Sequence, residues 1–344
     1  MRAAVVRAPG ELVIANVPVP SMGPYDALVR IEACSLCNST DIKIIDRHFA
    51  TSIPLPLIVG HESAGTVVEV GARVRAYRPG QRVLRPGACY ADPAVGLASA
   101  WGGFAEYGLA TDLAAWRADH PGERVPNGMW AKQQIAPPEI EPGLATALIT
   151  LKETLYSTRA AGVNNSTWTA IVGTGPVARA FTFWARHLGA PFVVVFGRQP
   201  RYCHEFLDLG ANNYVAGDRP CLVDEAKVAG LGAFDRVIEA VGTTAAIKDA
   251  LPLARPTGLV ACYGALAVDD REDETILAAR QAGRLVTLPV REEEAHDEVL
   301  ALVAAGVVDL SRWVSHRLPL ERIHEGIELV RSKQAVKVVM EMQR

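Results

Sequence analysis

The 344-residue sequence has no apolar run long enough to cross a membrane, and its N-terminus lacks the apolar core of a secretion signal. We therefore expect a cytoplasmic protein that does not act at a membrane. Basic residues are not in surplus either, because 35 Lys and Arg stand against 38 Asp and Glu, for a net charge of -3. Nucleic acid is therefore not an expected partner, since its phosphates must be neutralised by basic groups.

Cysteine is too sparse for a disulfide framework. The six cysteines are scattered over the chain, and Cys34 and Cys37 form a C-x-x-C without a second such pair. A four-cysteine structural zinc site therefore cannot be assembled. We expect reduced thiols apart from any that binds metal, with redox chemistry through the Cys34–Cys37 pair as an alternative.

The hydrophobic and charged fractions, 49% and 21%, are typical of a globular enzyme, and the chain is long enough for two domains. Short apolar segments separated by Gly and Pro predict a β-rich, barrel-like domain over 1–145. Its expected strands are Ala3–Arg7, Asp26–Ala33, Gly65–Val70, Arg82–Leu84 and Gly103–Leu109.

From about Leu144 strands and helices alternate, which predicts an α/β domain with a doubly wound parallel sheet over 146–288. Residues 289–344 are expected to return to the first domain. The expected strands of the second domain are Thr169–Val172, Phe192–Phe196, Arg236–Glu239, Leu259–Tyr263 and Arg284–Leu288. Its expected helices are Pro176–Leu188, Arg201–Leu209, Thr244–Leu253 and Asp273–Ala282.

A glycine loop opens the second domain. Residues 169–178 run from a predicted strand through G-x-G-x-x-A into a predicted helix. Gly173 and Gly175 would let the backbone approach a pyrophosphate, and Pro176 and Val177 would present the helix N-terminus to it. The alternative is an ordinary strand-to-helix turn. The context favours a dinucleotide site.

The end of the next predicted strand indicates which dinucleotide. An NAD enzyme places an acidic residue there for the ribose 2′-hydroxyl, but this chain has Gly197 followed by Arg198 and, shortly after, Arg201. Glycine leaves room for a 2′-phosphate, and the guanidinium groups can donate hydrogen bonds to it. The sequence therefore predicts NADP(H). The alternative is that both arginines lie on a solvated loop.

A thiol, an imidazole and several carboxylates form a candidate zinc site. Cys37 and His61 are ligand types that suit zinc, and Glu62 or Glu141 could complete the set, with Glu139 as a substitute. Taken alone, Cys37 could be a small buried hydrophobe and His61 a hydrogen-bonded core histidine.

These residues resemble the zinc-dehydrogenase signature of the medium-chain dehydrogenase/reductase superfamily. Residues 60–65 read Gly-His-Glu-Ser-Ala-Gly and are followed by Gly71 and Val74 at the signature's spacing. The resemblance covers nearly the whole chain, including the segments 79–83 and 102–107, the Glu141–Pro142 step, the glycine loop and the turns at Val241 and Gly264. It is closest to the polyol, sugar and threonine dehydrogenase branch.

The resemblance implies a GroES-like catalytic domain, a Rossmann domain whose cofactor contacts include Val241 and Gly264, and a homodimer or homotetramer. It also implies one catalytic zinc ion held by Cys37, His61 and a carboxylate at Glu62 or Glu141. Such an ion polarises an alcohol or carbonyl oxygen while nicotinamide carries the hydride. A small-molecule substrate is the expected partner.

The sequence departs from the family in two places. Relatives carry an aspartate three residues after the zinc cysteine, whereas here it is Asp41, four residues after Cys37. Ser39 or Thr40 could therefore serve the proton relay, or merely cap the following turn. The stretch 84–101 contains Cys89 alone where zinc-lobed relatives carry four cysteines, so no structural zinc is expected, and the loop 85–100 is free to form a substrate mouth or a subunit contact.

The sequence thus predicts a zinc-dependent oxidoreductase that transfers hydride between NADP(H) and a secondary alcohol, polyol, cyclitol or sugar-derived ketone. One alternative is a zinc-free enoyl or quinone reductase of the same fold, a reaction with no use for Cys37 beside His61 and Glu62. Another is an NADP(H)-binding protein without catalysis.

Overall fold

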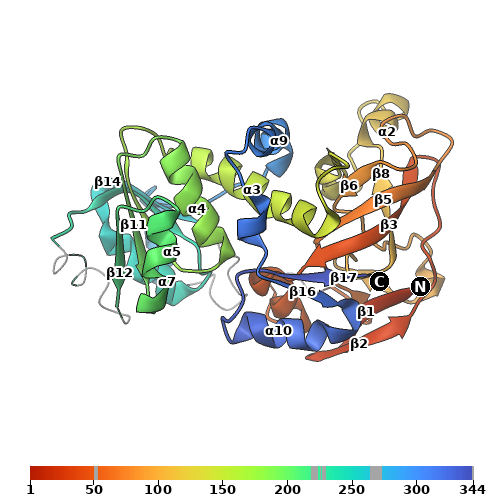
Figure 1. Cartoon of the computed structure of the whole chain (residues 1–344), viewed down its shortest axis with the longest axis horizontal. Coiled ribbons are helices and arrows are strands. Elements are labelled where there is room, and N and C mark those ends of the chain that lie inside the picture. Colours follow the sequence, from red (N-terminus) through yellow and green to blue (C-terminus); the bar gives the residue numbers. More distant parts are fainter. Residues whose placement is uncertain (50–52, 218–223, 225, 227–229, 264–272, 343–344) are drawn as a thin grey trace. The chain divides into compact units, whose positions relative to one another are not determined.

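The computed structural model describes residues 1–49, 53–217, 224, 226, 230–263 and 273–342 (Figure 1). The chain divides into two compact units, which are described separately. Unit 1 comprises residues 1–149 and 296–344, and unit 2 comprises residues 150–295. The predicted boundaries were 145/146 and 288/289. The second unit is thus an insertion in the sequence of the first.

Unit 1 is built from two sheets. One has the strand order β2-β1-β4-β7, and the other has the order β16-β17-β3-β5-β6-β9 with β8 paired to β3. The strands are β1 (Arg2–Ala8), β2 (Glu11–Asn16), β3 (Asp26–Ser35), β4 (Leu57–Ile58), β5 (Glu62–Val70), β6 (Arg82–Leu84), β7 (Ala98–Ser99), β8 (Tyr107–Thr111), β9 (Ile135–Ala136), β16 (His316–Pro319) and β17 (Val338–Glu341).

The helices of unit 1 are short. They are η1 (Asn38–Ile42), α1 (Lys43–Ile45), η2 (Pro93–Val95), α2 (Leu113–Asp119), η3 (Gly128–Lys132), α9 (His296–Ala304), η8 (Leu310–Trp313), η9 (Leu320–Arg322) and α10 (Ile323–Arg331). Helix α3 (Pro142–Ala160) begins in unit 1 and ends in unit 2.

The core of unit 1 depends on β3, whose residues alternate between buried and half-buried positions along most of the strand. Its inward side chains Ile31 and Cys34 join one apolar cluster with Ile323 of α10 and Met340 of β17. The last segment of the chain therefore supplies part of the same core as the first strands (Figure 1).

Unit 2 contains a parallel sheet with the strand order β12-β11-β10-β13-β14-β15, the arrangement of a doubly wound dinucleotide-binding domain. The strands are β10 (Trp168–Val172), β11 (Phe192–Gly197), β12 (Asn213–Ala216), β13 (Phe234–Glu239), β14 (Ala254–Cys262) and β15 (Leu285–Thr287). The helical segments are α4 (Pro176–His187), η4 (Pro200–Tyr202), α5 (Cys203–Asp208), α7 (Thr244–Ala250), η5 (Leu251–Leu253), α8 (Glu274–Gln281) and η7 (Glu292–Ala295). The predicted α/β fold class is confirmed.

Several elements differ from the sequence-based prediction, among them β2 and α3, which were not predicted. Strand β12 was not predicted, because four residues are too few for a clear pattern. The strand expected over Gly103–Leu109 begins only at Tyr107, because the amides of Gly103 and Phe104 donate to Gly60 and Val59 instead. The described parts of the chain contain no helix that is both long and apolar enough to span a bilayer.

Gly65 fixes how closely β3 and β5 approach. It pairs with Ile31, and a Cβ at this position would lie 2.3 Å from the carbonyl oxygen of Arg30 and 2.8 Å from the Cα of Ile31. We expect Gly65→Ala to force these backbones apart and to lower the free energy of unfolding by about 1–3 kcal/mol. The unfolding midpoint, measured by tryptophan fluorescence, should then fall by on the order of 5 °C. Gly128→Ala is the matched control, because a Cβ there would meet open space. A wild-type midpoint for Gly65→Ala would contradict this packing.

Candidate functional site

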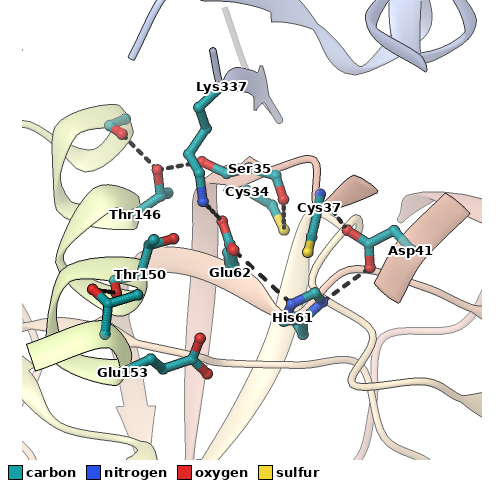
Figure 2. Close-up of polar contacts among 12 residues, drawn as sticks. Cys34, Ser35, Cys37, Asp41, His61, Glu62, Thr146, Thr150, Glu153 and Lys337 are labelled. Carbon is teal, nitrogen blue, oxygen red and sulfur yellow. Dashed lines mark hydrogen bonds and ion pairs between the residues drawn. The ribbon is translucent and has the colours of Figure 1, made fainter. Parts of the chain in front are cut away.

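Three potential metal ligands converge in unit 1. Cys37 follows β3, His61 precedes β5, and Glu62 is the first residue of β5. One donor atom from each, the Cys37 Sγ, an imidazole nitrogen and a carboxylate oxygen, lie within 4.8 Å of one another (Figure 2). His61 and Glu62 are buried and Cys37 is half-buried. Among the described residues this is the one such group of His, Cys, Asp and Glu.

The extra residue between Cys37 and Asp41 is absorbed by a π-helical turn, η1. The carbonyl oxygen of Cys37 accepts from the amide of Asp41 at 3.0 Å and from that of Ile42 at 3.5 Å, five residues on. Such wide turns accommodate one inserted residue and occur often at functional sites. The departure from the family spacing therefore leaves Asp41 facing back toward Cys37.

Asp41 connects two members of the metal-ligand group. Its Oδ2 accepts from the backbone N–H of Cys37 at 2.9 Å, and its Oδ1 lies 3.0 Å from Nδ1 of His61 (Figure 2). The side chain of Asp41 is fully buried. An imidazole that donates its Nδ1–H to a carboxylate keeps a lone pair on Nε2, so Asp41 prepares His61 as a ligand through Nε2.

The charges around His61 favour a cation there. Burial lowers the pKa of His61, but the carboxylate of Asp41 and the thiol of Cys37 outweigh burial and raise that pKa well above its usual value. The same negative groups would favour a metal cation, which would have to displace the proton from Nε2 to bind there.

Lys337 balances the charge of Glu62. Its Nζ, which comes from the residue before β17, is hydrogen-bonded to Oε2 of Glu62, and both side chains are 4% exposed. The other oxygen, Oε1, lies 4.0 Å from Nε2 of His61. Two buried opposite charges in contact compensate much of the desolvation penalty that each would otherwise carry. Sequence reasoning missed both Asp41 and Lys337.

Cys34 and Cys37 lie in different surroundings. Both are free cysteines, and Cys34 is fully buried in the apolar core of unit 1. Burial, with the nearby carboxylates of Asp41 and Glu62, raises the pKa of the Cys34 thiol well above its usual value. This raised pKa disfavours the thiolate that redox chemistry through the C-x-x-C pair would need.

Glu141 is engaged outside the metal-ligand group. Its carboxylate forms an ion pair with Arg317 at 2.6 Å and accepts from the amides of Gly143 and Leu144 at the start of α3. Burial raises the pKa of Glu141, but these hydrogen bonds outweigh it and hold the pKa below its usual value. Of the two candidate carboxylates, the structure brings only Glu62 to Cys37 and His61.

The two candidate proton-relay residues, Ser39 and Thr40, both lie half-buried on the π-helical turn.

The donor set of the metal-ligand group fits zinc. A thiolate, an imidazole and a carboxylate are the ligands that zinc takes at catalytic sites with three protein ligands. Magnesium and calcium prefer oxygen ligands alone, so the sulfur and nitrogen donors argue against them.

The glycine loop of unit 2 leads directly from β10 into the N-terminus of α4. Gly173 has φ of +129°, and Gly175 is extended at the N-cap of α4, with Pro176 and Val177 in the first turn. A Cβ on Gly173 would lie 3.1 Å from Val241, whereas a Cβ on Gly175 would meet nothing within 4 Å. The helix N-terminus is thus open to a ligand at Gly175.

The end of β11 presents a glycine followed by exposed arginine. A Cβ on Gly197 would come within 2.1 Å of the Tyr214 hydroxyl, so a larger residue here would have to displace the Tyr214 side chain. Arg198 is exposed directly after the strand, and the exposed Arg201 stacks on the Tyr202 ring at 4.8 Å. Gly264, the remaining predicted cofactor contact, lies outside the described residues.

Comparisons with known proteins match each of the two units to a dehydrogenase domain. The family model for the alcohol dehydrogenase GroES-like domain matches residues 23–119, and that for zinc-binding dehydrogenases matches residues 176–305. An alcohol dehydrogenase from Cupriavidus necator is 28% identical, with 96% of this chain and 94% of that protein covered. A sorbitol dehydrogenase from Bombyx mori is 25% identical, with 99% and 98% covered.

Solved structures show the same fold. The alcohol dehydrogenase TADH from Thermus sp. ATN1 aligns with a TM-score of 0.78 and 24% identity over 100% of both chains. A zinc-binding dehydrogenase from Sinorhizobium meliloti 1021, solved with NADP bound, aligns with a TM-score of 0.76 and 24% identity over 99% of both chains. With its GroES-like and Rossmann-type domains, the chain belongs to the zinc-type alcohol dehydrogenase family of the medium-chain dehydrogenases/reductases.

Proposed function

We propose that the protein transfers hydride between NADP(H) and a secondary alcohol, polyol, cyclitol or sugar-derived ketone at one catalytic zinc site formed by Cys37, His61 and Glu62. The observation that carries the proposal is the convergence of sulfur, nitrogen and oxygen donors within 4.8 Å. A bound zinc ion would supply Lewis acidity toward the substrate oxygen. A zinc-free reductase would have no use for this donor set.

The surrounding residues have separate roles. Asp41 fixes the ring orientation and tautomer of His61 and, through the Cys37 amide, the position of the thiolate. Lys337 holds one oxygen of Glu62 and leaves the other toward His61. Ser39 or Thr40, on the turn that follows Cys37, would relay the proton between substrate oxygen and solvent.

The cofactor preference follows from the end of β11. No acidic side chain stands at residues 197–201, where an NAD enzyme holds the ribose 2′-hydroxyl. The exposed guanidinium of Arg198, with that of Arg201, would instead bind a 2′-phosphate.

Zinc affinity tests the assignment of Glu62. We expect purified protein to bind about one zinc ion, and Glu62→Gln to weaken zinc binding by more than about 100-fold, measured by competition with a chromogenic chelator. Glu141→Gln is the matched control and should bind zinc as the wild type does, because Glu141 caps α3 and pairs with Arg317. Protein that takes up no zinc after supplementation would contradict the proposed function, and a selective loss in Glu141→Gln would reverse the ligand assignment.

The role of Asp41 can be separated from that of the ligands. Asp41→Asn keeps the side-chain shape but removes the charge that faces His61, so we expect zinc affinity to fall by about 10–100-fold. Asp46→Asn is the control, because the Asp46 carboxylate pairs with Arg331 at the surface. Equal zinc affinities in the wild type and Asp41→Asn would show that Asp41 does not prepare His61.

Cofactor titration tests the role of Arg198. We expect NADPH to bind at least about tenfold tighter than NADH, followed by nucleotide fluorescence, and Arg198→Ala to remove most of this difference, since a charged phosphate loses its donor. Arg255→Ala, near the start of β14, which β10 and β13 separate from β11 in the parallel sheet, should keep the preference. Equal wild-type affinities for the two cofactors would refute the NADP(H) assignment.

A further inference from the structure

An aromatic side chain lies against the metal-ligand group. The ring of Trp101 is 5.2 Å from that of His61, centroid to centroid, at an interplanar angle of 51°. The ring of Phe49 also contacts Trp101, with the two ring centroids 6.2 Å apart and the ring planes nearly perpendicular. Trp101 and Phe49, called here the aromatic pair, are both half-buried and pack against the core of unit 1.

The backbone of Trp101 is in the left-handed region, with φ of +66°. This conformation is unfavourable for a bulky residue, and residues kept in it tend to be found at functional sites. Glycine would adopt it without strain, and glycines do occupy the next two positions, 102 and 103. A tryptophan retained at a position suited to glycine indicates that its side chain is used.

Backbone contacts on two sides hold Trp101 in this conformation. On one side, the amide of Ala100 donates to Ile58 at 2.8 Å, and that of Gly103 donates to Gly60, the residue before His61, at 2.7 Å. These bonds anchor the tryptophan directly to the segment that carries the histidine ligand.

On the other side, the tryptophan carbonyl packs against Gly87. A Cβ on Gly87 would come within 1.7 Å of the Trp101 carbonyl oxygen, so only glycine permits this approach. The amide of Ala88 donates to the carbonyl of Gly102 at 3.0 Å. The ring of Trp101 is thus presented by a fixed backbone and not by a freely moving loop.

We propose that the aromatic pair determines substrate specificity by selecting alcohols and ketones whose reacting carbon carries a flat apolar group, such as a phenyl ring. This inference rests on the proposed function and narrows it. A substrate whose oxygen reaches the metal-ligand group must place its carbon substituents among the side chains beside that group, and Trp101 is in contact with His61 itself. A substrate ring would bury apolar surface and make an aromatic contact there.

The same contacts would weaken the binding of polyols. A hydroxyl facing the Trp101 and Phe49 rings gives up its hydrogen bonds to water without receiving an equivalent partner from the ring faces. The aromatic pair therefore disfavours a hydroxylated carbon chain on this side of the metal-ligand group. We expect the secondary alcohol 1-phenylethanol to be preferred over sorbitol.

Turnover by the zinc-loaded protein with NADP⁺ tests the proposal. The wild type should show kcat/KM for 1-phenylethanol at least about tenfold above that for 2-butanol or sorbitol. Trp101→Gly, which removes the ring without straining the backbone, should lower the value for 1-phenylethanol by about tenfold or more and change that for 2-butanol by less than about threefold, while Trp101→Phe retains most of the preference. The control is Trp130→Ala, a half-buried tryptophan that contacts Trp116.

Calorimetric binding of 1-phenylethanol and sorbitol to the same zinc-loaded proteins separates this inference from the proposed function. Tighter binding of 1-phenylethanol than of sorbitol, lost in Trp101→Gly, would support the role of the aromatic pair in specificity even if no alcohol is turned over. The absence of turnover would then reject only the proposed reaction. The inference would be overturned if turnover or binding favoured sorbitol. It would also be overturned if Trp101→Gly, with its zinc content unchanged, lost kcat/KM or affinity equally for all substrates.

Discussion

The carboxylate of Asp41 is the contact on which the site depends, because it joins two ligands that come from separate segments of the chain. It accepts from the amide of Cys37 and faces the Nδ1 of His61, and it is fully buried, so water does not weaken either interaction. The π-helical turn exists to keep this carboxylate in place despite one extra residue. Without the Asp41 carboxylate, no side chain among the described residues would contact both the Cys37 backbone and the His61 imidazole in this way.

The second constraint is charge. Asp41 and the thiol of Cys37 raise the pKa of His61, and the carboxylate of Glu62, 4.0 Å from Nε2 of His61, pairs with Lys337 from the residue before β17. A bound zinc ion would share Glu62 with Lys337, which already holds Oε2 of that carboxylate. The ion pair compensates the burial of Glu62, and it would make the carboxylate less available to zinc.

Local patterns predicted much of the fold and part of the site. The glycine loop, five strands of the parallel sheet and the group of Cys37, His61 and Glu62 could be identified because each rests on short-range chemistry. Lys337 could not be found, since it is 275 residues from Glu62 and nothing near it in sequence indicates a buried partner. Glu141 was a reasonable ligand by type, but the free amides at the start of α3 and Arg317 hold its carboxylate.

Trp101 shows why glycines next to a site are informative. Glycines are frequent around His61 and Trp101 in the sequence. In the structure Gly60, Gly87 and Gly103 let backbones approach so closely that any Cβ would collide. The resulting rigidity is what forces a neighbouring tryptophan into a left-handed conformation against a metal ligand.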